Sequence, residues 1–147
     1  MAKKTVFITG GTGTMGWAAF QELLKYPNDV NIRLLARKGP KNFKLLKPYL
    51  SYPNVKVVWG DLLDYESIQE GINGCDYVLH IGGMVSPAAD YKPYTTLKTN
   101  VTAAEYIVKA VKEQPDPDAV KVCYIGTVAE TGCRNAPIHW GRCGDPI

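Results

Sequence analysis

Three glycines near the start of the chain have the spacing of a turn that binds phosphate groups. Gly10, Gly13 and Gly16 follow the apolar run Val-Phe-Ile-Thr and precede a helix-forming segment. In such a strand–turn–helix unit the first glycine permits a tight turn, the second lets backbone N–H groups approach a pyrophosphate, and the third lets the helix pack closely. The positive end of the helix dipole strengthens the attraction. The segment therefore predicts a dinucleotide site, with a glycine turn that binds no ligand as the alternative.

A second type of phosphate-binding loop, the P-loop of nucleoside triphosphatases, does not fit this turn. The stretch from Gly11 to Gly16 has the P-loop spacing, but Trp17 stands where a lysine is required. The dinucleotide interpretation is therefore the better one.

The end of the second expected strand carries the residues that would choose between NAD and NADP. An acidic side chain at this place binds the ribose 2′-hydroxyl of NAD, whereas a basic one binds the 2′-phosphate of NADP. Here Arg37 and Lys38 follow the strand, with no carboxylate nearby. Arg37 can bind a phosphate through a planar, charge-assisted pair of hydrogen bonds, and Lys38 adds a second positive charge. The pair favours NADP, with NAD still open, unless it is only a solvated basic turn.

The composition is that of an ordinary globular domain. The chain has 147 residues, of which 46% are hydrophobic and 21% charged, and its net charge is +3. So small a charge gives no argument for a nucleic acid or an anionic membrane surface as partner. No apolar run approaches the roughly 18 residues of a membrane span. The N-terminus runs directly into a strand, so we expect a cytoplasmic protein without a signal peptide.

The cysteines and histidines do not predict a metal site. Cys75 and Cys123 lie beside apolar runs and are expected to be small buried residues, while Cys133 and Cys143 flank a loop that they could close. The chain has no C-x-x-C pair and no histidine at zinc-finger spacing. Free thiols are expected in a reducing compartment.

Strand and helix patterns alternate along the chain, which favours an α/β fold. Apolar, β-branched runs predict strands at 6–9, 30–36, 55–59, 76–81 and 120–125, and periodic segments predict helices at 15–25, 41–50, 65–72 and 96–111. Five strands joined through helices call for a parallel sheet that helices cover on both faces. Right-handed crossovers and the glycine turn favour a Rossmann-type, doubly wound sheet of order 3-2-1-4-5.

The last of these helices has the clearest periodicity. Its apolar residues step by four and three along one face, as in a helix that buries that face: Leu97, Val101, Ala104, Val108 and Val111. After residue 126 the alternation stops. We therefore divide the chain into a dinucleotide-binding domain at 1–126 and a loop-rich tail at 127–147, and we expect the sheet to be truncated before a sixth strand.

Four motifs together resemble the extended short-chain dehydrogenase/reductase family, which includes nucleotide-sugar epimerases and dehydratases. They are the T-G-G-T-G-x-x-G turn that ends at Gly16, the triplet Gly60-Asp61-Leu62, the run His80-Ile81-Gly82-Gly83, and Asn100 in the following helix. The resemblance covers residues 5–132.

The resemblance implies roles for individual residues. Asp61 and Leu62 would lie against the adenine, Asn100 would order the catalytic centre, and Thr127 stands where the family has its catalytic Ser or Thr. Together with the glycine turn and the basic pair, the expected cofactor-binding set is Gly10, Gly13, Thr14, Met15, Gly16, Arg37, Lys38, Asp61, Leu62, Ile81, Gly82, Gly83, Val85, Asn100 and Ile125. Within it, Ile81, Gly82, Gly83 and Val85 would line the ribose and nicotinamide side.

Some of these assignments have structural alternatives. The family more often has alanines where this chain has Gly82 and Gly83. Asp61 could simply cap the helix that follows the third strand, and Asn100 could be a satisfied polar group on its helix. His80 is expected to be a structural histidine at a strand end.

The family's catalytic centre also requires a tyrosine and, four residues later, a lysine. The tyrosine is the general acid and base, and the lysine lowers its pKa and binds the nicotinamide ribose. Tyr52 and Lys56 have this spacing, but a proline and a strand lie between them; Tyr94 and Lys98 share a helix, but they precede the fifth strand, whereas the family's pair follows it. We therefore expect the acid–base pair to lie outside this chain.

The sequence thus favours the NADP-binding portion of an extended short-chain dehydrogenase/reductase that acts as an epimerase, dehydratase or reductase. The substrate class implied by the resemblance is a nucleotide sugar, and this chain alone is expected to be inactive. One alternative is a non-catalytic dinucleotide-binding or redox-sensing module; another is a flavodoxin-like domain that binds a different anion. An exposed edge at strand 120–125 would also favour self-association.

Overall fold

The computed structural model describes residues 2–127 and shows five strands alternating with helices. The strands are β1 (Lys4–Thr9), β2 (Val30–Ala36), β3 (Val55–Trp59), β4 (Tyr77–His80) and β5 (Lys121–Tyr124). The α-helices are α1 (Thr14–Leu23), α2 (Pro40–Leu46), α3 (Tyr65–Ile72), α4 (Ala88–Tyr91) and α5 (Pro93–Lys112), and short 3₁₀ turns follow α2 at Lys47–Tyr49 and α5 at Pro117–Ala119. Tail residues 128–147 and the possible pairing of Cys133 with Cys143 lie outside the described residues.

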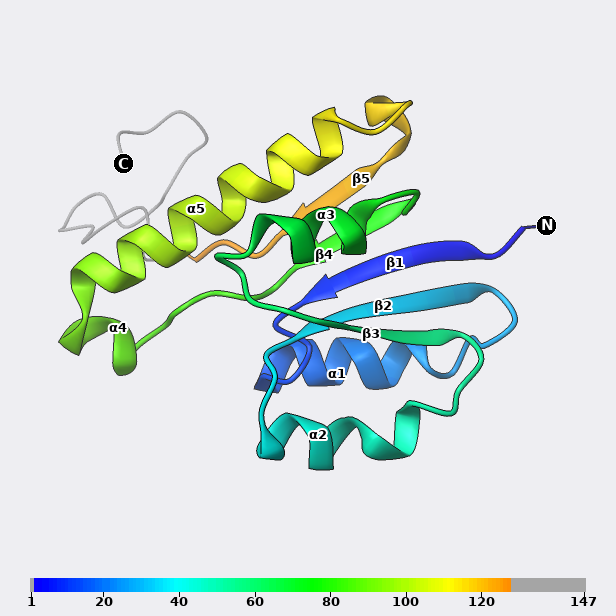
Figure 1. The fold of residues 1–147 in the computed structure, drawn as a ribbon, viewed down its shortest axis with the longest axis horizontal. Coiled ribbons are helices and arrows are strands. Elements are labelled where there is room, and N and C mark those ends of the chain that lie inside the picture. Colours follow the sequence, from blue (N-terminus) through cyan, green and yellow to red (C-terminus); the bar gives the residue numbers. More distant parts are fainter. Residues whose placement is uncertain (1, 128–147) are drawn as a thin grey trace, which may run out of the picture.

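The strands form one parallel sheet in the order β3-β2-β1-β4-β5, as predicted (Figure 1). In this register Ile8 of β1 pairs with Leu34 of β2, and Thr9 of β1 pairs with His80 of β4. His80 in turn pairs with Tyr124 of β5. The chain therefore starts in the middle of the sheet, extends to β3 on one side, and crosses back to β4 and β5 on the other.

Helices cover the two faces of the sheet with separate apolar cores (Figure 1). On one face, Phe20 of α1 and Leu46 of α2 pack with Ile8 and Leu34, and all four side chains are fully buried. The other face is formed by α3 and α5, whose buried residues are Ile68, Ile72, Ile107 and Ala110, together with Phe7, Leu35, Val58 and Val78 of the sheet. Burial of β1 on both sides explains its continuous apolar sequence.

Helix α5 buries a different face from the predicted one. Ala103, Ile107 and Ala110 are its buried residues. Leu97 and Val108 of the predicted face are 65% and 51% exposed. Ile107 and Ala110 instead belong to the apolar core that α5 shares with α3 and the sheet. Val111 of the predicted face is partly buried and packs against the same core, whereas the rest of that face is partly or mostly exposed.

Cys123 of β5 also differs from expectation, because it is exposed, whereas Cys75 is buried as predicted. The register pairs Cys123 with Leu79, a residue that packs against the core on the α1 and α2 face. All four residues of β5 are exposed. The burial of the central strands does not extend to this position.

Three helices differ in extent from their predicted bounds, and α1 is Thr14–Leu23 in place of 15–25. Helix α5 begins at Pro93, which is favoured at the first helical positions because proline lacks the N–H that would be unpaired there. The helix predicted at 41–50 is α2 followed by the turn Lys47–Tyr49, and Leu50 beyond it is 49% exposed. Helix α4 was not predicted. No described helix has the length and apolar character that crossing a membrane requires.

Arg33 of β2 anchors the end of α3. Its guanidinium group donates hydrogen bonds to the carbonyl oxygen of Gly71 at 3.1 Å and to that of Asn73. These carbonyls lie at the helix C-terminus, where backbone acceptors lack intrahelical partners and the helix dipole is negative. A charged donor from the sheet therefore satisfies them and holds the helix in place.

Candidate functional site

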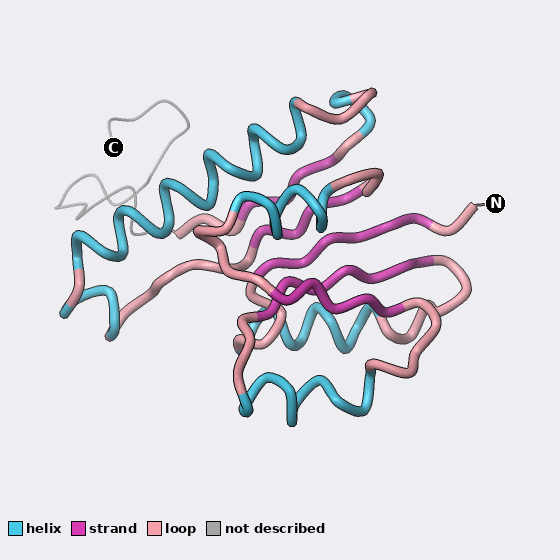
Figure 2. The backbone as a smooth tube through the Cα atoms, in the orientation of Figure 1, coloured by secondary structure: helices cyan, strands magenta, loops and turns pink. Residues whose placement is uncertain are grey.

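The predicted site residues lie at one edge of the sheet, where the loops after β1, β2, β3 and β4 gather (Figure 2). All strands are parallel, so their carboxyl ends meet at this edge. In doubly wound sheets, ligands bind here at the point where the strand order reverses. That point lies between β1 and β4 in this chain.

The glycine turn has the conformation that its sequence predicts. Gly10 has φ +71°, a left-handed conformation that favours glycine, and its carbonyl oxygen accepts a hydrogen bond from the Gly13 N–H at 2.9 Å. A Cβ atom on Gly16 would lie 2.1 Å from the Gly10 oxygen, so helix α1 can start against the turn only with glycine there. Thr14 and Met15, in the first turn of α1, have exposed side chains. Their N–H groups belong to the first turn of a helix, which has no intrahelical acceptors for its amides.

The segment after β4 packs directly on this turn. A Cβ atom on Gly10 would lie 2.7 Å from the Cα atom of Gly82, and one on Gly82 would lie 2.9 Å from the Gly10 nitrogen. The same Cβ on Gly82 would be 3.3 Å from Leu62. Three segments that are far apart in the sequence are thus brought together. The close approach also explains why this chain has glycine at position 82.

Thr9 and His80 join the ends of β1 and β4 beneath this contact. The Oγ1 atom of Thr9 lies 2.7 Å from Nδ1 of His80 and accepts a hydrogen bond from the Gly82 N–H at 3.0 Å. Both side chains are buried, and burial lowers the pKa of His80 below its ordinary value. His80 is therefore structural, as expected. Thr9 was not identified from the sequence; its place directly before Gly10 was the available signal.

Asn100 holds the chain that follows Gly83. Its side-chain oxygen accepts a hydrogen bond from the Met84 N–H at 2.8 Å, and its side-chain nitrogen donates to the Met84 carbonyl at 3.0 Å. A Cβ atom on Gly83 would lie 3.1 Å from the Asn100 oxygen. Asn100 is thus a satisfied polar group on α5, and what it satisfies is the loop that the resemblance assigns to the nicotinamide side.

Asp61 does not cap α3 in this structure, because Asp64 occupies the N-cap position of that helix. Instead, a carboxylate oxygen of Asp61 accepts a hydrogen bond from the Leu63 N–H at 3.0 Å. The Asp61 side chain is partly buried. This local bond fixes the turn that presents Leu62 to the Gly82 segment.

Arg37 and Lys38 lie at the same edge with exposed side chains. The strand end before them is fixed, because the Gly60 N–H donates to the Ala36 carbonyl at 3.0 Å and Asn42 donates to the Arg37 carbonyl at 2.8 Å. The backbone of Arg37 is therefore held while its guanidinium group is open to a ligand.

The remaining predicted residues are more peripheral. Ile81 is partly buried, and Val85 is 70% exposed. The Ile125 N–H donates to the His80 carbonyl at 3.2 Å, and its side chain is 42% exposed. Thr127 follows β5 and is exposed. Among residues 2–127, no three His, Cys, Asp or Glu side chains are grouped to hold a metal ion.

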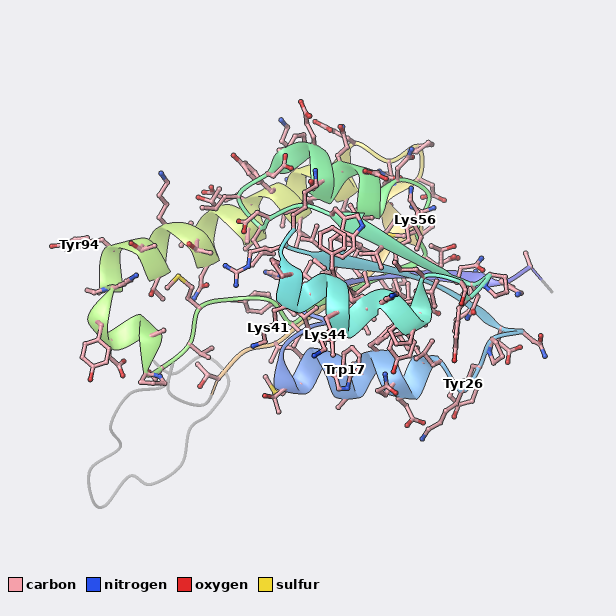
Figure 3. All side chains as sticks on the ribbon, turned by 60° about the horizontal axis from the view of Figure 1, so that its bottom comes forward. Trp17, Tyr26, Lys41, Lys44, Lys56 and Tyr94 are labelled. Carbon is pink, nitrogen blue, oxygen red and sulfur yellow. The ribbon has the colours of Figure 1, made fainter. Side chains whose placement is uncertain are left out.

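The two Tyr-x-x-x-Lys matches lie in different surroundings. Tyr94 is 88% exposed, and Figure 3 shows it at the outer end of the molecule. Lys98 on the next turn of α5 is exposed as well. Lys56 forms an ion pair with Glu70 at 2.7 Å, and Tyr52, before β3, packs against Tyr49 with ring centroids 5.6 Å apart. Trp17, in place of the P-loop lysine, likewise packs on Tyr49. Figure 3 shows Trp17 on α1.

A family model and the similar proteins agree in naming epimerases. The family model described as the NAD dependent epimerase/dehydratase family matches residues 6–140. A UDP-glucose 4-epimerase of Rickettsia akari (strain Hartford) is 37% identical over 111 residues, which are 73% of this chain and 32% of the relative. The corresponding protein of Rickettsia felis is 36% identical over the same shares. This chain spans about a third of the length of these relatives.

Solved structures have the same fold. Pen from Bacillus thuringiensis matches with a TM-score of 0.66 and 26% identity, covering 74% of this chain and 34% of that one. A UDP-glucose 4-epimerase from Bifidobacterium longum, solved with NAD⁺ and UDP, matches with a TM-score of 0.68 and 21% identity over 88% of this chain and 38% of its own. With the family match over most of its length, the chain belongs to the NAD dependent epimerase/dehydratase family.

Proposed function

We propose that this chain is the dinucleotide-binding part of an enzyme that acts on a nucleotide sugar as an epimerase, dehydratase or reductase. The observation that carries the proposal is the convergence of the Gly10 turn, Leu62 and Gly82 at the switch point of the sheet. The related proteins named UDP-glucose 4-epimerase support the substrate class. The B. longum structure with NAD⁺ and UDP supports a nicotinamide dinucleotide.

Within this class of cofactor, we propose that NADP binds more tightly than NAD. Arg37 and Lys38 supply positive charge beside the held strand end, and the stretch 36–40 contains no carboxylate for a ribose 2′-hydroxyl. Several similar structures were solved in complex with NAD. The preference for the phosphorylated form therefore depends on the two basic residues of this chain.

Calorimetric titration of both cofactors tests the proposal. An exposed charge contact supports a preference for NADP of about 1–2 kcal/mol, or roughly tenfold in Kd. Arg37→Asp should narrow or reverse this preference, whereas the control Lys112→Asp, on an exposed residue at the far end of α5, should leave it unchanged. Equal affinities, or tighter NAD, in the wild-type chain would contradict the NADP assignment. Failure to bind either cofactor would favour a domain for a different anion.

We further propose that the chain binds cofactor without catalysing a reaction. The Thr127 hydroxyl can donate one hydrogen bond to a substrate oxygen, but a threonine alone does not exchange a proton at neutral pH. Loss of general acid–base catalysis typically lowers a rate about 10²–10⁴-fold, and loss of substrate positioning lowers it further. Turnover is measured by the absorbance of the reduced nicotinamide for a reductase, and by separation of the sugar substrate and product for an epimerase or dehydratase, which produce no net reduced cofactor. Turnover that disappears in Tyr94→Phe would show that Tyr94 and Lys98 are the catalytic pair after all.

We also propose that β5 favours self-association. Val122 and Tyr124 are 47% and 60% exposed, and β5 is a terminal strand of the described sheet. Exposed strand edges pair readily with other chains. Sedimentation should show concentration-dependent assembly that Val122→Lys reduces. A protein that stays monomeric over a wide concentration range would contradict the proposed self-association through β5.

A further inference from the structure

The buried hydroxyl of Thr9 contacts the ends of two segments at once. Its oxygen accepts a hydrogen bond from the Gly82 N–H at 3.0 Å and lies 2.7 Å from Nδ1 of His80, within hydrogen-bond distance. Both side chains are buried, so bulk water does not compete for these contacts.

The three groups connect the two loops directly beyond the last paired residues of β1 and β4. Thr9 is the residue before Gly10, and His80 is two residues before Gly82. Because the backbones of Gly10 and Gly82 are already too close to admit a side chain, a shift of one loop must displace the other. A slip along β4 would separate the Gly82 N–H from the Thr9 oxygen. The hydrogen bonds therefore define the spacing between the loops.

We propose that Thr9 and His80 are positioning residues that set the distance between the pyrophosphate turn and the segment at 81–83, which would line the nicotinamide ribose. This inference rests on the proposed function. Both side chains are buried, so neither is exposed for contact with the cofactor. Their role is to hold the two halves of the site at the separation that a complete dinucleotide spans.

Two substitutions at Thr9 separate this role from simple packing. Thr9→Val keeps the shape of the side chain and removes the hydroxyl, whereas Thr9→Ser keeps the hydroxyl and removes a methyl group. The probes are ADP, which reaches only the adenine side and the pyrophosphate turn, and NADP⁺, which also reaches the segment at 81–83. We expect Thr9→Val to raise the Kd of NADP⁺ roughly tenfold and that of ADP less than about threefold, with Thr9→Ser close to wild type.

A matched pair at His80 provides a second test. His80→Asn keeps a hydrogen-bonding group at the place of Nδ1 and should largely preserve NADP⁺ binding, whereas His80→Leu should resemble Thr9→Val. In the chain without cofactor, the Gly82 amide should be protected from hydrogen exchange in the wild type and in Thr9→Ser, and should lose that protection in Thr9→Val.

The outcomes distinguish this inference from the proposed function. If the wild type binds NADP⁺ but Thr9→Val and Thr9→Ser change its Kd alike, or if ADP and NADP⁺ weaken in parallel, the positioning role is wrong while the proposed function stands. If the wild type binds neither probe, the proposed function is wrong and the positioning role falls with it. Unchanged protection of Gly82 in Thr9→Val would overturn the hydrogen-bond assignment itself.

Discussion

The centre of the sheet and its β5 side have similar sequences but very different environments. Phe7 and Ile8 of β1 are fully buried, because helices pack on both faces of the central strands. Val122 and Tyr124, in an equally apolar strand, are about half exposed, with fractions of 47% and 60%. The same contrast occurs across α5, whose inner stripe is buried and whose larger outer stripe is not.

This contrast shows that an apolar sequence makes a parallel strand suitable for burial but does not ensure that other elements cover it. In a doubly wound sheet each crossover helix covers the strands beside it, so the centre is covered by connections from both directions. A strand at the side of the sheet is buried only if another element packs on it. Substitutions at buried and exposed positions test this difference in burial.

The largest effect should separate two adjacent residues of α5. Ile107 is 2% exposed and Val108 is 51% exposed. Ile107→Ala should lower the free energy of unfolding by about 2–5 kcal/mol, because it leaves a cavity in the core, whereas Val108→Ala should change it by less than about 0.5 kcal/mol. Denaturant unfolding measures both. A comparable loss in Val108→Ala would mean that the outer stripe is covered in solution.

Gly16 should be nearly as sensitive. Its Cβ in Gly16→Ala would meet the backbone of the Gly10 turn at 2.1 Å, so the helix must shift, at about 1–3 kcal/mol of stability and with loss of cofactor binding. In the control Gly39→Ala, a Cβ meets nothing within 4 Å and Gly39 has an extended φ of 162°. Both are measured by thermal unfolding and cofactor titration; normal binding by Gly16→Ala would refute the close packing of turn and helix.

Two basic residues of the sheet, one in β2 and one in the terminal strand β3, should differ through their contacts with α3. Arg33→Met removes the donor to the helix C-terminal carbonyls and should destabilise the chain by about 1–2 kcal/mol. Lys56→Met removes an exposed ion pair with Glu70 and should cost less than about 0.5 kcal/mol. Chemical denaturation compares the two. Equal effects would show that the Arg33 contacts add little.

The smallest effect concerns the boundary between the two regions, where His80 of β4 faces Tyr124 of β5 with ring centroids 5.5 Å apart. Burial lowers the pKa of His80 below its unfolded value of 6.5. Below pH 6.5 the histidine of the unfolded chain takes up a proton, whereas the buried histidine of the folded chain stays neutral until the pH reaches its lower pKa. The free energy of unfolding should therefore fall as the pH drops from 6.5 to that lower pKa, and the stabilisation should be complete above pH 6.5. His80→Asn should remove this component of the pH dependence. The control is His139→Gln, which changes the other histidine of the sequence. A dependence that persists in His80→Asn would assign it elsewhere.

Local sequence patterns predicted most of the fold. The strands at 30–36 and 55–59 and the helix at 65–72 have the predicted bounds, because turn residues flank uninterrupted apolar or amphipathic runs. The glycine turn was also predictable, since the left-handed φ at Gly10 and the close packing at Gly16 disfavour residues with a side chain. The cofactor-binding and catalytic roles of all the predicted site residues, Arg37, Lys38 and Thr127 among them, remain predictions.

Tertiary packing decided what separate segments do together. The local pattern of 96–111 does not predict that the stripe with Ala103 and Ala110 is the buried one, since either apolar stripe would satisfy helical periodicity. The hydrogen bond between Thr9 and His80 joins residues 71 positions apart. Such contacts depend on strand order and register, which only the assembled sheet specifies. Periodicity and turn chemistry act over a few residues and are encoded locally, whereas the spacing of a site between two loops exists only when β1 and β4 lie side by side.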